Sequence, residues 1–443
     1  MKVSRSFTQY ARYASFNVLG MVGLSCYILA DTFFVAQGLG SNGLTALNLA
    51  IPVYNLIHGT GLMLGMGGAT QYSIAMGRKE TDRLHQIFTH TLLLGAVLAV
   101  IFVLTGLLLS QPIAQLLGAD YTVLPMTEIY LRTLLLFAPA FLLNDIILCF
   151  VRNDSNPQLA MAAMVTGSLS NVVLDYLFIF PLGMGMFGAV FATGLAPIIS
   201  LCVLSLHFFR QKNGFHPVRP KLSGAIAGKV FSLGFPSLVT EFSSGIVIIL
   251  FNTLLLSLAG NTAVAAYGVV ANLSLVILAV FTGVAQGTQP LLSSTFGLKH
   301  FTQLKLFLRY ALITVLILSA IFYLFILWQP DLIVSWFNSE QNQQLQETAR
   351  QGLLFYFIGI FFAGINILLS IFFTSTEQSL PGQAVSLLRG LFLIIPAALL
   401  LSTWLGVPGI WLSFPAAELL TLVIGGWIYL KQGKVQFTRD YTG

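Results

Sequence analysis

The stretch LTALNLAIPVYNLIHGTGLMLGMGGATQYSIAMGRK, residues 44–79, decides the fold because a weakly similar stretch follows 220 residues later. That second stretch, residues 264–299, reads VAAYGVVANLSLVILAVFTGVAQGTQPLLSSTFGLK. The residues that coincide at this shift are Gly40, Gly67, Gly77 and Lys79 in the first copy and Gly260, Gly287, Gly297 and Lys299 in the second. The chain is therefore predicted to contain two copies of one structural unit in the same orientation.

The composition indicates that each copy lies in a membrane. Of the 443 residues, 56% are hydrophobic and only 8% are charged, and the mean hydropathy is +0.86. Apolar stretches long enough to cross the hydrocarbon core recur along the whole chain. We count twelve, at about 12–36, 44–76, 86–109, 125–150, 159–180, 188–209, 226–258, 263–296, 304–327, 348–374, 383–403 and 408–430.

These stretches predict an all-α integral membrane protein of twelve transmembrane helices around a central cavity. The first six-helix lobe covers residues 1–209 and the second covers 226–443, with a linker at 210–225. A duplicated pair of lobes in the same orientation is typical of secondary transporters, in which the substrate path lies between the lobes.

The basic residues predict the orientation in the membrane. All but Arg132 and Arg350 of the 21 lysines and arginines fall at the termini or in the even-numbered loops. By the positive-inside rule, both termini and the linker are expected in the cytoplasm, with the chain in the inner membrane of a prokaryotic cell. The net charge of +6 thus reports topology and gives no support to nucleic-acid binding.

Two further features limit the interpretation. The polar start of the chain runs straight into a full-length span, so no cleavable signal peptide is expected. The three cysteines, Cys26, Cys149 and Cys202, fall within spans without the spacing of a metal site, and we interpret them as free thiols.

Two acids in apolar spans point to function. Asp31 lies near the end of the first span, and Asp175 lies near the end of the fifth, one helical turn after Asn171. A carboxylate in a bilayer is costly and usually serves an ion, a proton or a substrate. With a rise of about 1.5 Å per residue, both acids and Thr193 are expected roughly 8 Å below the outer ends of their helices. Together these side chains could bind Na⁺ or share a proton.

The second copy lacks this chemistry. At the repeat shifts, Asp31 coincides with Phe251, while Asn171 and Asp175 fall on Phe392 and Pro396. Ion coupling is therefore predicted for the first lobe alone.

Other polar residues within the spans have weaker signals. Glu241 follows a predicted kink at Pro236, and it could meet a cationic substrate or a second proton. We interpret Asp145 and Arg152, seven residues apart on one helix face, as having a structural or gating role, Glu418 as structural and His58 as a packing residue. Further side chains expected to line the substrate cavity are Met63, Met66, Asn252, Asn272 and Gln286.

Three motifs resemble those of the multidrug and toxic compound extrusion (MATE) family, in its DinF-like or MepA-like branch. They are Ala30-Asp31-Thr32, Gly77-Arg78-Lys79 and the Asn171–Asp175 segment followed by Thr193. The resemblance covers essentially the whole chain and implies that Asp31, Asn171, Asp175 and Thr193 serve the coupling ion.

The chain departs from the family pattern in two places. Phe16-Asn17 stands where the first helix commonly has a proline, and the tenth span has Asn366 but no acid. The missing acid argues against the NorM-like branch.

The resemblance implies a secondary active antiporter that exports amphipathic, cationic organic compounds in exchange for H⁺ or Na⁺ by alternating access. We expect it to act as a monomer in the bilayer, with no cofactor besides the coupling ion. A lipid-linked oligosaccharide flippase is less favoured because the spans are nearly free of Lys and Arg. An intramembrane lipid-modifying enzyme such as a prenyltransferase would need paired Asp-rich motifs, which the sequence lacks. The sequence does not decide between the two ions.

Overall fold

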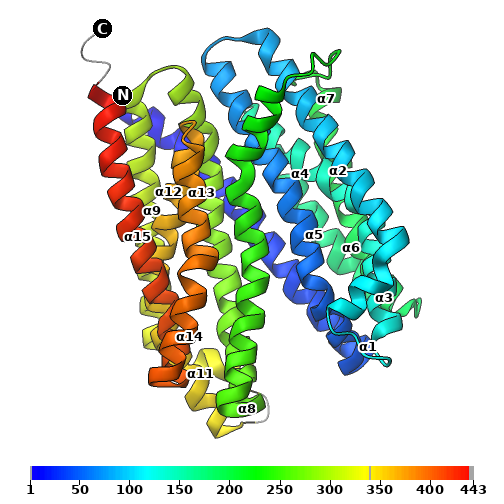
Figure 1. Cartoon of the computed structure of the whole chain (residues 1–443). Coiled ribbons are helices and arrows are strands. Elements are labelled where there is room, and N and C mark those ends of the chain that lie inside the picture. Colours follow the sequence, from blue (N-terminus) through cyan, green and yellow to red (C-terminus); the bar gives the residue numbers. More distant parts are fainter. Residues whose placement is uncertain (1, 339–340, 439–443) are drawn as a thin grey trace.

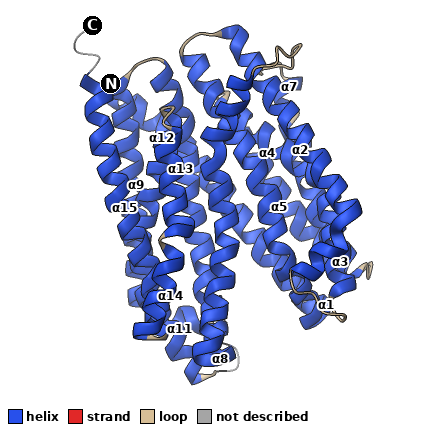
Figure 2. Ribbon diagram, viewed as in Figure 1, coloured by secondary structure: helices blue, strands red, loops and turns tan. Residues whose placement is uncertain are grey.

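The computed structural model describes residues 2–338 and 341–438, so Arg439, one of the residues used to predict topology, lies outside it. The described residues form helices and connecting loops, with no β-strand among them (Figure 2).

Two very long helices form the centre of the molecule. α1 (Lys2–Gly77) is broken at Gly40, with φ 67°, and α8 (Gly224–Gly297) is broken at Gly260, with φ 71°. Glycine tolerates this positive-φ backbone at little cost because it has no Cβ. The two coinciding glycines of the repeat therefore mark the turns between the first two spans of each lobe.

The remaining helices complete the lobes (Figure 1). In the first lobe they are α2 (Thr81–Leu116), α3 (Leu124–Leu136), α4 (Ala138–Asn153), α5 (Pro157–Ile179), α6 (Gly185–Leu204) and the short α7 (Leu206–Phe209). In the second lobe they are α9 (Phe301–Trp328), α10 (Pro330–Ser335), α11 (Gln343–Tyr356), the 3₁₀-helix η1 (Phe357–Gly359), α12 (Ile360–Ser375), α13 (Ser379–Leu387), the π-helix η2 (Leu388–Phe392), α14 (Ile394–Leu405) and α15 (Val407–Thr438).

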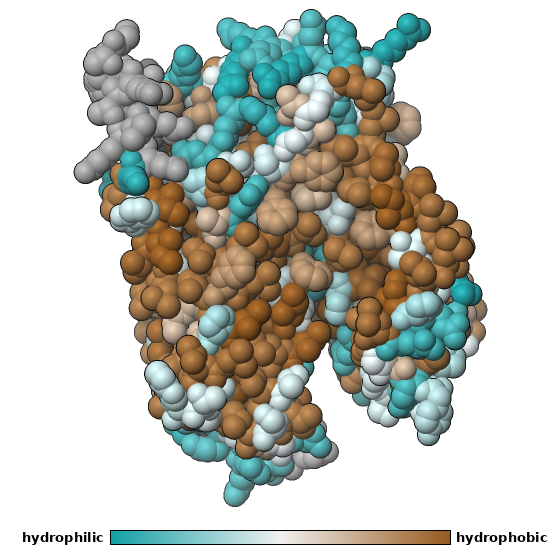
Figure 3. Space-filling view, viewed as in Figure 1, coloured by the Kyte–Doolittle hydropathy of each residue, from teal (hydrophilic) through white to brown (hydrophobic). Residues whose placement is uncertain are grey.

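The number of spans agrees with the prediction. Among the described residues, nine helices are long and apolar enough to cross a membrane, and the pair α3–α4, bent by 47°, makes a tenth. Two of these ten, α1 and α8, each contain two spans joined at a glycine, so the chain makes twelve crossings. Each lobe has its own buried apolar cluster, and exposed apolar residues such as Leu108 on α2 and Leu324 on α9 cover its outer surface (Figure 3).

The two lobes meet on the side where α1 begins and α15 ends, which we call the terminal side. Between them a cleft opens on the opposite side, which we call the open side (Figure 3). A Cβ on Gly67 would lie 1.9 Å from the backbone oxygen of Val230, and one on Gly287 would lie 2.7 Å from that of Tyr13. The coinciding glycines of the repeat therefore allow the backbones of the two lobes to touch.

An ion-pair cluster also joins the lobes on the terminal side. Glu377, between α12 and α13, accepts hydrogen bonds from Arg78 of the first lobe at 2.6 Å and from Lys229 of α8 at 2.8 Å. Burial raises the pKa of Glu377, but the bonds to Lys229 and Arg78 outweigh it and hold this pKa below its ordinary value.

The linker is fixed to the first lobe along α2. Phe215 is fully buried and its ring contacts those of Phe88 and Phe150. The backbone N–H groups of Val218 and Ser223 donate to Thr89 Oγ1 at 3.0 Å and to His90 Nε2 at 3.1 Å. The extended chain therefore has both side-chain and backbone anchors up to the residue before α8.

Candidate ion-coupling site and cavity

The structure brings together the four residues predicted to serve the coupling ion. Asp31 from α1, Asn171 and Asp175 from α5 and Thr193 from α6 are all buried, with Asp31 7% and Asp175 0% exposed. The amide nitrogen of Asn171 donates to Asp175 Oδ2 at 3.0 Å, and its oxygen accepts from the Thr193 N–H at 3.2 Å. In the opposite orientation, the amide oxygen would face the Asp175 carboxyl oxygen.

The carboxyl groups of Asp31 and Asp175 lie close enough together to share a hydrogen bond. Two ionised carboxylates have only acceptor atoms, so a hydrogen bond between them requires a proton on one of them. Their remaining oxygens, Asp31 Oδ1 and Asp175 Oδ1, are buried without a partner among the described residues. The site can therefore hold one proton between two acids, and its oxygens are also of the type that binds a hard cation.

Tyr130 of α3 is a further member of this site that the sequence did not single out. Its side chain is 3% exposed and lies close to Thr193 and to both acids. A tyrosine within a predicted span was the available signal, because a buried phenol needs a polar partner.

A cavity adjoins the ion site inside the first lobe. Tyr27, one turn before Asp31 on α1, lines it together with Thr193 of α6, and the Tyr27 hydroxyl contacts that of Tyr54 at 2.5 Å. Gln286 of α8 reaches the same cavity from the second lobe. The cavity thus touches both the ion site and the contact between the lobes.

His58 and Asp145 form a pair on the cavity wall, so His58, interpreted as a packing residue, also has a polar partner. His58 Nδ1 lies 3.0 Å from Asp145 Oδ2, across the contact between α1 and α4. Gly61 provides the space for this carboxyl group, since a Cβ there would lie 2.5 Å from Asp145 Oδ2. The sequence could not show this pair because its members are on different helices.

Asp145 and Arg152, both predicted to have a structural or gating role, have different partners. Arg152 is 1% exposed and donates to Asn17 Oδ1 at 2.7 Å and to Gln286 Oε1 at 3.1 Å. Asn17 in turn donates to the backbone oxygen of Gly283 on α8 at 2.9 Å. The asparagine that replaces the expected proline therefore connects the first span to the second lobe.

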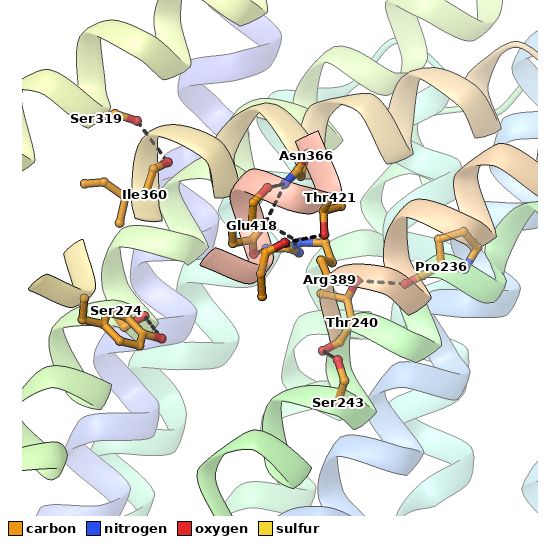
Figure 4. Close-up of polar contacts among 12 residues, drawn as sticks. Pro236, Thr240, Ser243, Ser274, Ser319, Ile360, Asn366, Arg389, Glu418 and Thr421 are labelled. Carbon is orange, nitrogen blue, oxygen red and sulfur yellow. Dashed lines mark hydrogen bonds and ion pairs between the residues drawn. The ribbon is translucent and has the colours of Figure 1, made fainter. Parts of the chain in front are cut away.

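Glu418 has the structural role predicted for it, and its partner is Arg389, whose position was predicted wrongly (Figure 4). Arg389 was assigned to a loop, but it lies in the π-helix η2, and its Nη2 and Nε donate to Glu418 Oε1 at 2.7 and 3.1 Å. Asn366 of α12 donates to Glu418 Oε2 at 2.7 Å. The spans thus contain the buried Arg152 and the partly buried Arg389, both of which had been counted with the loops in predicting the orientation.

The other residues predicted for the substrate cavity are dispersed. Glu241 is half-buried on α8, and its Cβ lies 3.0 Å from the position that a Cβ on Gly59 would occupy. Asn252 and Asn272 are half-buried on α8, and Met63 and Met66 are buried on α1. Of the six predicted residues, Gln286 lines the described cavity, and Met66 contacts Arg152 through its sulfur at 3.1 Å.

Comparisons with known proteins agree with this architecture. The MatE family model matches residues 18–177 and 236–400. The multidrug export protein MepA of Staphylococcus saprophyticus is 25% identical over 91% of this chain and 89% of its own length. The protein of the same name from Staphylococcus aureus is 23% identical over 92% of this chain and 90% of its own length.

Solved structures share the fold. A MATE protein in complex with MaL6 has a TM-score of 0.91 at 22% identity and covers 97% of this chain and 96% of its own. An outward-facing multidrug resistance MATE family transporter of the MOP superfamily has a TM-score of 0.90 at 21% identity with the same coverage.

The two-lobed helical fold and these matches define a multi-pass membrane transporter rather than an enzyme. The chain belongs to the MatE family, whose model matches well over half of it.

Proposed function

We propose that this protein is a secondary active antiporter that exports amphipathic, cationic organic compounds by alternating access, with H⁺ as the coupling ion. The observation that carries the proposal is the close approach of the buried carboxyl groups of Asp31 and Asp175. A proton between two such groups removes the repulsion of two buried negative charges, which favours H⁺ over Na⁺, although the same oxygens suit either ion. The relatives named multidrug export proteins support an organic substrate.

The basic residues support placing the terminal side in the cytoplasm. In that orientation the cleft faces outward, and the contact between the lobes closes the cytoplasmic end. A proton that enters from outside would reach the acid pair, remove one of its negative charges and lower the cost of enclosing it in the membrane. Proton and compound are then linked because each shifts the same equilibrium between outward-open and inward-open states.

The test is transport into proteoliposomes under an imposed pH gradient or an imposed Na⁺ gradient, applied one at a time. We expect the pH gradient alone to drive a cationic dye, and we expect the D31N and D175N variants to lose that drive. The matched control is D331N, which changes an exposed acid of α10 on the open side. Transport by both site variants at the wild-type rate would refute the assignment, and drive by Na⁺ alone would replace the proton with Na⁺.

A further inference from the structure

The cavity in the first lobe has a counterpart in the second lobe that is filled. The repeat can be aligned there by backbone conformation, because Ser155 and Glu377 have φ of 65° and 60°, and Gly185 and Gly406 have φ of 62° and 64°. The first pair sets a shift of 222 for spans four and five, and the second sets a shift of 221 for span six. Asn144, Gly167 and Pro197 then coincide with Asn366, Arg389 and Glu418.

The coinciding residues of the two lobes differ in the space that their side chains leave empty. Asn144, Gly167 and Pro197 all line the first-lobe cavity. At the matching place in the second lobe, the Arg389 and Glu418 side chains pair with one another and Asn366 completes the group (Figure 4). A glycine and a proline have therefore been exchanged for two long charged side chains that occupy the equivalent space. The place in the first lobe is open, and protein side chains occupy the equivalent place in the second lobe.

The polar part of this cavity has hydrogen-bonding atoms that lack a partner. Asn144 Oδ1, Asp145 Oδ2 and Ser200 Oγ are buried with no hydrogen-bond partner among the described residues. Asp145 and Ser200 are only 3% and 4% exposed. His58 Nδ1 lies 3.0 Å from Asp145 Oδ2, but each carboxylate oxygen can accept more than one hydrogen bond, so the Asp145 carboxylate can also accept from a ligand. Leaving such groups unpaired is costly, and a ligand with N–H donors would relieve that cost.

The rest of the wall fits an aromatic or aliphatic body. Met21, Leu24, Phe141 and Met164 line the cavity. The rings of Tyr54 and Phe141 meet edge to face at 5.8 Å, beside the acceptor group. Aromatic faces next to a carboxylate favour an organic cation over an inorganic one.

We propose that Asn144 and Asp145 bind the ammonium or guanidinium group of the transported compound, while its apolar body lies against the first-lobe wall. His58 acts as a positioning residue, since its ring holds the Asp145 carboxylate at the cavity surface over Gly61. The proposal rests on the proposed function and adds to it a binding group that is separate from the Asp31–Asp175 pair.

The test compares two probes with the same fluorescent body. Dansylcadaverine carries a primary ammonium group, and its N-acetyl derivative is neutral. We measure the binding of each to the purified full-length protein in detergent. D145N is expected to raise the Kd of the ammonium probe by about tenfold or more, since a hydrogen bond to a charged group is worth about 1.5–3 kcal/mol. The Kd of the acetylated probe, and both values in the D331N control, should stay unchanged.

His58 is tested by two substitutions. H58L removes the polar contact to Asp145 and should weaken the ammonium probe, whereas H58Q restores an N–H group and should recover its affinity. Neither change should affect the binding of the neutral probe. If His58 had a merely structural role, its substitution would weaken the binding of both probes alike. If H58L and H58Q bind the ammonium probe equally, His58 does not position the carboxylate. These variants also test the site if D145N does not fold.

The outcomes separate this proposal from the proposed function. If D145N binds both probes like the wild type, or loses both alike at an unchanged melting temperature, the ammonium site is refuted. In that case ion-driven transport by the wild type would still support the antiporter. If the wild type shows the Asp145-dependent preference for the ammonium probe but no gradient drives transport, the site stands and the antiporter fails.

Discussion

The buried pair of Arg389 and Glu418 allows a quantitative prediction of stability. The Glu418 side chain is 3% exposed and that of Arg389 is 10% exposed, so water cannot replace a lost partner. Glu418→Gln leaves a guanidinium group buried without a counter-charge, and such a loss costs about 3–5 kcal/mol. Arg389→Met should cost a similar amount because it leaves the carboxylate with Asn366 as its remaining partner.

The double variant R389M/E418L should recover most of this loss. Replacing a whole buried ion pair by apolar side chains of similar volume is often neutral or even stabilising. The free energies of unfolding of the wild type, R389M, E418L and R389M/E418L, measured by denaturant titration in micelles, give the coupling between the two residues. D331N is the control, because Asp331 and Arg350 are exposed with their charges 3.8 Å apart, and such pairs contribute about 0–1 kcal/mol. The reasoning is wrong if the double variant is as unstable as E418Q, or if E418Q is as harmless as D331N.

Three further predictions concern the terminal side. E377Q should open the contact between the lobes, seen as faster hydrogen–deuterium exchange in α1 and α8. The closed form lowers the Glu377 pKa, so protonation of Glu377 weakens the closed contact. Wild-type exchange should therefore rise to the E377Q level only as the pH falls below about 4.3. A constant difference between the two proteins at all pH values would contradict this. G67A places a methyl group 1.9 Å from the Val230 oxygen and should prevent closure and abolish transport, with normal transport as the contrary result. F215A removes a fully buried ring at a cost of about 3–5 kcal/mol, so limited proteolysis should cut the linker at 210–223 faster than in the wild type.

The features that could be predicted from the sequence lie at positions where the structure or the function tolerates few residue types. Gly67 and Gly287 were recognisable because only glycine fits where the two backbones touch, and both copies of the repeat meet this requirement. Asp31 and Asp175 were recognisable because a carboxylate in an apolar span is costly and is rarely kept without an ion, a proton or a substrate to bind. Their depth followed from the rise of a helix, and the structure does bring them into contact.

The parts that could not be predicted depend on contacts between helices. His58 and Asp145 are 87 residues apart in the chain, and nothing in the local sequence of either helix indicates the other. Arg389 was placed in a loop because a positive charge next to an apolar stretch usually marks its end. In the structure the charge is neutralised by Glu418 from another helix, so the span continues past it.

The two copies of the repeat are similar where the lobes contact one another and differ inside the lobes, and this difference has a physical cause. Each lobe faces the other at the terminal side, so a change in one copy of that surface must be matched by the other. Gly77 and Gly297 show this, because a Cβ on either would clash with the opposite backbone, at 2.6 Å from the Ser294 oxygen and 2.3 Å from the Ile74 oxygen. The lobe interiors face no such partner and could diverge, one into a cavity and the other into an ion pair. In the proposed mechanism, a symmetric contact that closes beside an off-centre cavity lets the two lobes move as equal bodies while one of them carries the ligand.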